Sequence, residues 1–421
     1  MPNADSLTPK LAAARALLFA SLVSLASSWE TMYHFVELVI QREGNPDHTE
    51  LITGTLIVFV QTLAIAKTDL CQLPLRNLSA GAFVLLLTLG LISTSWSYVP
   101  TYATFEWLLL VTTVLAFMGI ATRYGTSVLL IGQFIACETI IVAAIASDEF
   151  SFSDGGYFVY PGKLSPIVQI ALCILVGLLI TSRLNSSKLR AKALITTGLI
   201  LLNFAALLNI ENRTGQLSSL ITLGFGILVV CARLTEKATK KTKLTQALTR
   251  LGAPVILLTS FLLMRFTPSS FFGREFDTTF TGRKTLWKAA WEGTIDRPIF
   301  GWGWVSGWFN PVYRDTVLPE VGGRAPRFYW SHSVWLDLGL SVGFIGIVLA
   351  FIAIMASVTS SLRGRKFDFT IATSTLLVTT LTVHLMFESL HRDMQLAFAV
   401  LLIATLNRKQ VFGPPAISLD A

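Results

Sequence analysis

Charged residues are scarce in this chain of 421 amino acids. Asp, Glu, Lys and Arg make up 14% of the sequence, whereas soluble domains contain about 25%. Hydrophobic residues account for 53%. This balance excludes a disordered chain, a coiled coil and an ordinary cytosolic enzyme.

Cysteine is also rare. The four thiols stand far apart and lie mostly within apolar segments, at Cys71, Cys137, Cys173 and Cys231. No Cys-x-x-Cys pair is present, so a thiolate metal site is not expected. We interpret these cysteines as small side chains that fill the core.

Long apolar segments, separated by short polar connections, are what the sequence has in abundance. About 20 residues at a rise of about 1.5 Å per residue cross the hydrocarbon core of a bilayer. The pattern therefore predicts an all-α integral membrane protein with about 12 transmembrane helices. The expected spans are 11–28, 51–66, 80–96, 105–122, 126–145, 164–182, 193–210, 214–232, 251–266, 331–356, 370–387 and 394–406.

The basic residues indicate an orientation. With the N-terminus inside, 20 of the 33 Lys and Arg fall on inner segments and four fall on short outer ones. This bias follows the positive-inside rule and places both termini in the cytoplasm. It also explains the net charge of +8 without nucleic acid, since the run 237–243 would face anionic lipid headgroups.

The loop 267–330, between the ninth and tenth spans, is the longest outer connection. It holds six of the ten tryptophans, which argues against disorder. Trp287, Trp291 and Ile295 recur at helical spacing within 283–296, so we expect a helix there that ends near Pro298. We interpret Trp287 and Trp291 as membrane-interface anchors.

The other loop tryptophans allow two interpretations. Trp302, Trp304 and Trp308 follow the expected helix, in and just after a Gly-Trp-Gly-Trp turn. An indole ring can stack on a sugar, yet Trp is also the ordinary anchor of membrane interfaces. Both interpretations stay open for these three residues.

Arginines at the outer mouth suggest an anion site. Arg213 and Arg283 sit beside Gly and Thr, where the backbone can approach an anion, and Arg274 lies in the same loop as Arg283. A planar guanidinium makes paired hydrogen bonds to phosphate oxygens. The outer loops contain no Asp-x-Asp pair, so no metal site is expected there.

His332 is the candidate base, because an imidazole titrates near neutral pH and can take a proton from a hydroxyl. Taken alone, such a histidine is more often a hydrogen-bonded interface residue. Glu388 and Arg392 are expected nearby, on the short outer loop between the last two spans. Glu138, inside the fifth span, is either functional or paired with another helix.

Several ordered motifs resemble those of the O-antigen ligase and polysaccharide polymerase superfamily, including succinoglycan-type exopolysaccharide polymerases. The resemblance covers roughly residues 195–395. The similar stretches are Asn-Arg-Thr-Gly at 212–215, Thr-Gly-Arg-Lys-Thr-Leu-Trp at 281–287, Arg-Pro-Ile-Phe-Gly-Trp-Gly at 297–303, Ser-His-Ser at 331–333, Gly339, Gly-Phe-Ile-Gly at 343–346 and Glu-Ser at 388–389.

The resemblance implies a metal-independent, inverting glycosyltransferase of the GT-C type without a cofactor. Its donor would be a glycan on undecaprenyl diphosphate at the outer face of the cytoplasmic membrane. Arg213 and Arg283 would hold the diphosphate, with Arg274 as a third candidate, and His332 would deprotonate the acceptor hydroxyl. Glu388, Arg392, Trp302 and Trp304 would support the site. Many relatives carry Asn where this chain has Ser333.

This interpretation divides the chain into three parts. Residues 1–210 are N-terminal transmembrane helices, 211–406 form a ligase- or polymerase-like domain that includes loop 267–330, and 407–421 are a cytoplasmic tail. We expect Arg213, Arg283 and His332 to line one outward-facing cavity. The expected partners are the lipid-linked donor, a glycan or lipid–glycan acceptor and membrane lipids, but no nucleic acid.

Two alternatives to a ligase remain at this stage. A repeat-unit polymerase of the same superfamily would use the same groups, because acceptor choice depends on cavity shape. A polysaccharide transporter or flippase would favour interrupted helices in matching halves and charges at the midplane. The charged and aromatic residues gather instead at one outer mouth, which favours the enzyme.

Overall fold

The computed structural model describes the chain in separate segments. They are residues 4–28, 46–66, 78–146, 161–181, 194–203, 205, 219–221, 223–225, 228, 270–271, 274–275, 283–311, 331–361, 369–386 and 398–401.

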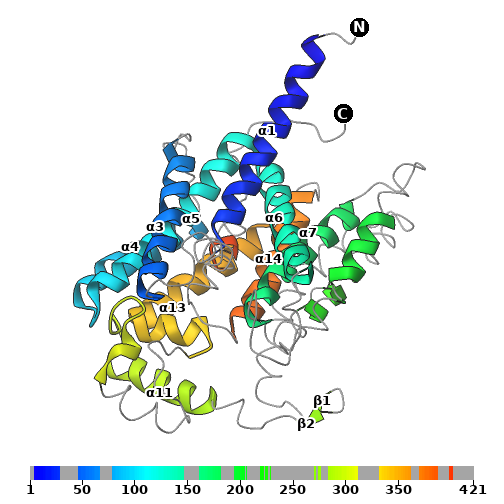
Figure 1. Ribbon diagram of the computed structural model, residues 1–421. Helices are drawn as coiled ribbons and strands as arrows, with labels where there is room; N and C mark the ends of the chain where they lie inside the picture. Colours follow the sequence, from blue (N-terminus) through cyan, green and yellow to red (C-terminus); the bar gives the residue numbers. More distant parts are fainter. Residues whose placement is uncertain are drawn as a thin grey trace.

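Two helix pairs form the N-terminal part of the bundle (Figure 1). Helix α1 (Ala4–Ala26) packs against α6 (Thr126–Ala146), and α3 (Pro46–Ala66) packs against α5 (Pro100–Tyr124). Gly125, at a φ of +92°, ends α5 and allows α6 to begin at the next residue. Pro100 occupies the first turn of α5, where its missing N–H costs no helical hydrogen bond.

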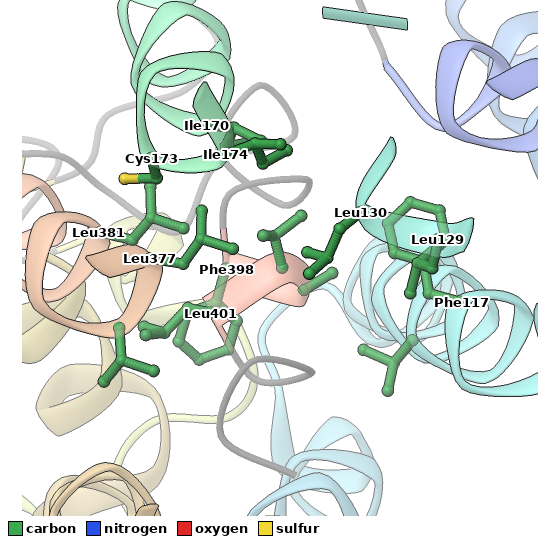
Figure 2. Packing of buried hydrophobic residues seen from close by; sticks show 14 of the residues in the cluster. Phe117, Leu129, Leu130, Ile170, Cys173, Ile174, Leu377, Leu381, Phe398 and Leu401 are labelled. Carbon is green, nitrogen blue, oxygen red and sulfur yellow. The ribbon is translucent and has the colours of Figure 1, made fainter. Parts of the chain in front are cut away.

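The apolar core lies between the α5–α6 pair and a second pair, α7 (Pro161–Thr181) and α14 (Phe369–Leu385). Figure 2 shows Phe398 and Leu401 between these two sides. Both residues are about as buried as the core helices around them, with exposed fractions of 2%. A segment near the C-terminus therefore packs into the centre of the bundle.

Helix α13 (Val334–Ser361) packs along α4 (Leu78–Ser93), and buried residues of both helices belong to the same apolar core. The short 3-10 helix η2 (Thr94–Trp96) extends α4. Ser79 ties the far ends of the two long helices together, since its hydroxyl donates to the carbonyl of Ala353 at 2.8 Å.

Helix α11 (Arg283–Asp296) lies across α13, at the end of the bundle opposite the start of α1 (Figure 1). It is followed by the 3-10 helix η4 (Gly307–Phe309). Strands β1 (Ser270–Phe271) and β2 (Arg274–Glu275) form a two-residue antiparallel ladder. This ladder is a small addition to the all-helical architecture that the sequence predicts.

The helix expected over 283–296 is confirmed, and α11 ends just before Arg297-Pro298 as expected. A proline disfavours helical backbone at the residue before it, which explains the stop. The face of α11 that packs against α13 is also apolar. Leu286, Ala289 and Ala290 are buried in a small cluster with Leu340 of α13.

The transmembrane prediction is confirmed in part. Among the described residues, four helical stretches are long and apolar enough to cross a bilayer, namely Leu78–Trp96, Pro100–Tyr124, Thr126–Ala143 and Val334–Ala356. Shorter apolar helices occur at Leu11–Ala26, Ile52–Ala66, Leu164–Leu179, Leu194–Asn203 and Phe369–Leu385. The expected span 251–266 lies outside the described residues, and 214–232 and 394–406 are described only in fragments. The total of 12 stays a prediction.

Helix α13 is broken, whereas the sequence predicts one continuous span at 331–356. Gly343 adopts a φ of +71° and a ψ of −170° inside the helix. The N–H of Phe344, which a continuous helix would direct at Leu340, donates instead to the carbonyl of Pro298 at 2.7 Å. The carbonyl of Leu340 accepts the N–H of Trp302 at 2.8 Å. The loop thus replaces the hydrogen-bond partners that the break removes.

The turn 301–303 fits against the break because its glycines have no side chain. Gly301 and Gly303 both have positive φ, at +62° and +103°. The Gly303 N–H donates to the carbonyl of Ser341 at 2.9 Å. A Cβ on Gly303 would lie 2.7 Å from the Cα of Ser97, and one on Gly301 would lie 2.5 Å from the carbonyl carbon of Ser341.

We predict that Gly303→Ala destabilises the protein by about 1–3 kcal/mol, because the methyl group meets backbone atoms at a left-handed position. The measurement is the melting temperature of the purified protein in detergent. Gly81→Ala is the matched control, since a Cβ at Gly81 in α4 meets nothing within 4 Å. An equal melting temperature for the two variants would contradict the close approach of turn and helix.

Candidate functional site

His332 lies at the entrance to α13 in a strained backbone conformation. Its φ is +53°, and the residue is half-buried. Left-handed backbone is uncommon for a residue with a side chain and costs about 1–2 kcal/mol. Such strain persists only where the surroundings hold it, and it is concentrated at functional sites.

Ser331 and Ser333 hold the backbone on both sides of His332. The hydroxyl of Ser331 donates to the carbonyl of Ser333 at 2.9 Å and accepts the N–H of Ser333 at 3.1 Å. Ser331 is fully buried and Ser333 is nearly so. The two serines therefore close a ring of hydrogen bonds around the histidine position.

Asp337, one turn into α13, binds both of these serines. Its Oδ1 accepts the N–H of Ser331 at 3.0 Å, and its own N–H donates to the carbonyl of Ser333 at 2.9 Å. The same Oδ1 accepts the indole N–H of Trp308 at 3.2 Å. From the sequence, Asp337 was assigned no role, so its part in the site was missed.

Helix α11 reaches the same place through Trp287. The indole N–H of Trp287 donates to the carbonyl of Ser331 at 2.8 Å. Trp287 thus binds the segment before His332 rather than only anchoring the loop in the membrane interface. Trp291 and Ile295 are exposed at 47% and 52%, so the interface role fits these two residues.

Trp302 is half-buried and is fixed from several directions. Its indole N–H donates to the carbonyl of Gly293 at 2.8 Å. The Arg297 guanidinium lies 3.9 Å from the centre of the ring, and Tyr98 stacks against it with ring centres 5.9 Å apart. Arg297 therefore makes a cation–π contact with Trp302.

Trp304 and Trp308 face the protein interior. Trp304 is only 1% exposed, and it packs on Gly90 of α4, where a Cβ would lie 3.0 Å from the indole. Trp308 is 9% exposed and donates to Asp337. Neither residue is free to stack on a sugar or to anchor in lipid. The two rings instead hold the turn and the 3-10 helix η4 against the long helices.

The remaining candidates are described in part or not at all. Arg283 is the first residue of α11 and Arg274 lies in β2, but the structure describes only their backbone. Arg213, Glu388 and Arg392 lie outside the described residues. The expected meeting of Arg213, Arg283 and His332 in one cavity therefore stays a prediction.

Glu138 is paired, which is the simpler of the two interpretations raised above. The side-chain amide of Asn203 donates to its Oε1 at 2.7 Å. This bond joins α6 to the helical stretch 194–203. Within the described residues, no group of three or more His, Cys, Asp or Glu could hold a metal ion.

Two signals in the sequence point to the parts of the site that were missed. An acidic residue in the first turn of a helix, as Asp337 is, commonly binds the free N–H groups at that end. Glycines within a span, as at Gly339 and Gly343, mark close approach or a break. A Cβ on Gly339 would lie 2.9 Å from the hydroxyl of Thr294 in α11.

Comparison with known families identifies one match. Residues 158–351 match the family model for O-antigen ligase. The matched segment contains α11, the turn 301–304, His332 and the break in α13. No curated protein matches the chain.

We predict that His332→Gly is more stable than His332→Ala by about 1 kcal/mol, because glycine adopts a positive φ without the penalty that a Cβ brings. Both variants lose the same imidazole, so the comparison isolates the backbone. Melting temperatures of the two purified proteins in detergent provide the measurement. A more stable alanine variant would mean that residue 332 is not held in a left-handed conformation.

Proposed function

Since residues 158–351 match the family model for O-antigen ligase, we propose that this multi-pass membrane protein transfers a glycan from an undecaprenyl-diphosphate-linked donor to an acceptor hydroxyl. Transfer would take place at the outer face of the cytoplasmic membrane. The family is one of membrane glycosyltransferase-type enzymes, and the long apolar helices agree with it.

The conformation of His332 is the observation that carries the proposal. The half-buried His332 has a left-handed backbone and lies between two serines that are hydrogen-bonded to each other. Ser331 is also bound to Asp337 of α13 and to Trp287 of α11. The structure maintains a costly backbone conformation at the one titratable residue of the 331–333 motif. A base that must meet a hydroxyl at a fixed distance benefits from such fixation.

The position of Arg283 in α11 supports a shared site. Arg283 precedes Trp287 by four residues, so the two positions lie on the same face of the helix. Trp287 contacts Ser331, the neighbour of His332. Arg283 also begins the helix, where free N–H groups and the helix dipole favour an anion. A diphosphate bound there would lie next to the histidine segment.

In the proposed reaction, the imidazole of His332 takes the proton from the acceptor hydroxyl. The acceptor oxygen attacks the anomeric carbon of the donor sugar as the bond from that carbon to the diphosphate oxygen breaks. The configuration at the carbon inverts, and undecaprenyl diphosphate leaves with the negative charge. Arg213 and Arg283, with Arg274 as a third candidate, would stabilise that charge.

The location of the site supports the proposed sidedness. The first residues of α1 and the helix α11 lie at opposite ends of the bundle (Figure 1). With the N-terminus cytoplasmic, as the positive-inside bias predicts, α11 and His332 would lie on the outer side. A polymerase of the same superfamily would use the same groups, and the acceptor that is used decides between polymerase and ligase.

We predict that Arg283→Lys loses at least about 100-fold in transfer rate, whereas the protein still inserts and accumulates. Lysine keeps the charge but cannot make the paired, planar contact to two diphosphate oxygens, and loss of one such donor costs about 3–4 kcal/mol. The assay is glycan transfer from a purified lipid-linked donor, with protein amount measured by blotting.

Lys288→Ala is the control for Arg283→Lys. Lys288 lies on the same helix, and its side chain is 77% exposed, with a long 3.9 Å contact to Glu292. This variant should transfer at the wild-type rate. Near-normal transfer by Arg283→Lys would mean that residue 283 acts only as a long-range charge.

We further predict that His332→Ala lowers transfer about 100- to 10,000-fold but leaves donor binding largely intact, because the arginines hold the diphosphate and the histidine meets the acceptor. Wild-type activity should withstand EDTA. Donor binding and transfer are measured on the same purified samples. Activity that EDTA removes and Mg²⁺ restores, or wild-type turnover by His332→Ala, would each refute the mechanism.

A further inference from the structure

We infer that Asp337 is a positioning residue, which holds His332 in its working conformation through the backbone on both sides of it. This inference rests on the proposed function, because it assigns Asp337 a task in the reaction that His332 would perform. Asp337 itself touches neither donor nor acceptor in this scheme.

Asp337 contacts the residue before the histidine and the residue after it. Its Oδ1 accepts the N–H of Ser331 at 3.0 Å, and its backbone N–H donates to the carbonyl of Ser333 at 2.9 Å. Residue 332 is therefore enclosed between two points that one residue of α13 binds. Because α13 is packed against α4 and α11, the position of this long helix also fixes the position of His332.

The Asp337 carboxylate also links η4 to this segment. Oδ1 accepts the Trp308 indole N–H at 3.2 Å as well as the Ser331 N–H. Asp337 and Trp308 are 8% and 9% exposed, so both bonds lie in surroundings with little water. A buried carboxylate that accepts two N–H groups binds them more strongly than a neutral acceptor would. Removing it leaves two buried donors without a partner.

Only one of the two carboxylate oxygens makes these bonds. Oδ2 is also buried and meets no hydrogen-bond donor within the described part of the chain. An asparagine at 337 could keep its Oδ1 on Ser331 and Trp308 and place its amide nitrogen where Oδ2 lies. The positioning role needs this acceptor oxygen and not a base. Asp337→Asn should therefore work where Asp337→Leu does not.

The strain at residue 332 explains why such fixation is needed. A φ of +53° is unfavourable for histidine, so a loosened segment would relax toward negative φ and move the imidazole. A displacement of about 1 Å can cost about 100-fold in rate. Loss of the Asp337 acceptor should therefore lower kcat, while donor affinity, which depends on the arginines, should change little.

The test compares Asp337→Leu, Asp337→Asn and the control Lys288→Ala in transfer from the lipid-linked donor. We expect Asp337→Leu to lower kcat about 100-fold with little change in the donor KM. We expect Asp337→Asn to stay within about threefold of the wild type. Wild-type kcat in Asp337→Leu, or an Asp337→Asn enzyme as poor as the leucine variant, would overturn the inference.

A double mutant separates positioning from general destabilisation. If Asp337 acts through His332, adding Asp337→Leu to His332→Ala should not lower the residual transfer further. An independent structural role would instead multiply the two losses. Trp308→Phe, which removes one donor to Oδ1 and keeps an aromatic side chain, should cause a smaller drop in kcat than Asp337→Leu.

Hydrogen–deuterium exchange provides a readout that does not depend on activity. The amides of 331–333 should exchange slowly in the wild type and in Asp337→Asn, and faster in Asp337→Leu. If the wild type transfers no glycan, the proposed function fails, and the exchange result still decides whether Asp337 holds this segment. Equal exchange in all three proteins would overturn the inference regardless of transfer.

Discussion

The break in α13 at Gly343 is the constraint on which the region around the candidate site depends. Backbone groups inside a membrane helix need partners within the protein, because lipid offers none. The turn after α11 supplies them, through Trp302 to the carbonyl of Leu340 and through the Pro298 carbonyl to Phe344. This exchange fixes where the loop meets the helix. It also explains why glycine is required at Gly301 and Gly303, since a side chain there would collide with the helix or with Ser97.

The turn after α11 also contacts the N-terminal half of the chain. Ser93, in the last turn of α4, donates its hydroxyl to its own helix at Gly90 and accepts the N–H of Trp304 at 3.0 Å. Trp304 then fills the space above Gly90 between α4 and α5, where Trp107 also lies. The N-terminal helices therefore form one wall of the loop region. The family match, which begins at residue 158, does not include this wall.

The apolar runs and the helix-breaking residues allowed much of this architecture to be predicted from the sequence. Apolar runs predicted the positions of α4, α5, α6, α7 and α14 to within a few residues, and Pro298 predicted the end of α11. The break in α13 was missed, because a stretch as apolar as 331–356 predicts one continuous span. The hydrogen-bond partners that replace those of the helix come from a separate segment, 298–303. The environment of the tryptophans could not be predicted for a related reason. Composition shows that Trp302, Trp304 and Trp308 are grouped, but only tertiary packing decides which ring faces a neighbour and which faces lipid.

The site itself shows the same division between local and distant information. The motif made His332 a candidate, but it did not predict the left-handed backbone there, since groups from three places bind the flanking segment. Trp287 comes from α11, Trp308 from η4 and Asp337 from α13. Ser333 follows the histidine, and its N–H and carbonyl are both bound to the Ser331 hydroxyl. The backbone at 333 is thus held without an amide side chain. The fixation of the histidine therefore depends on the residues that flank it and on the carboxylate that binds them.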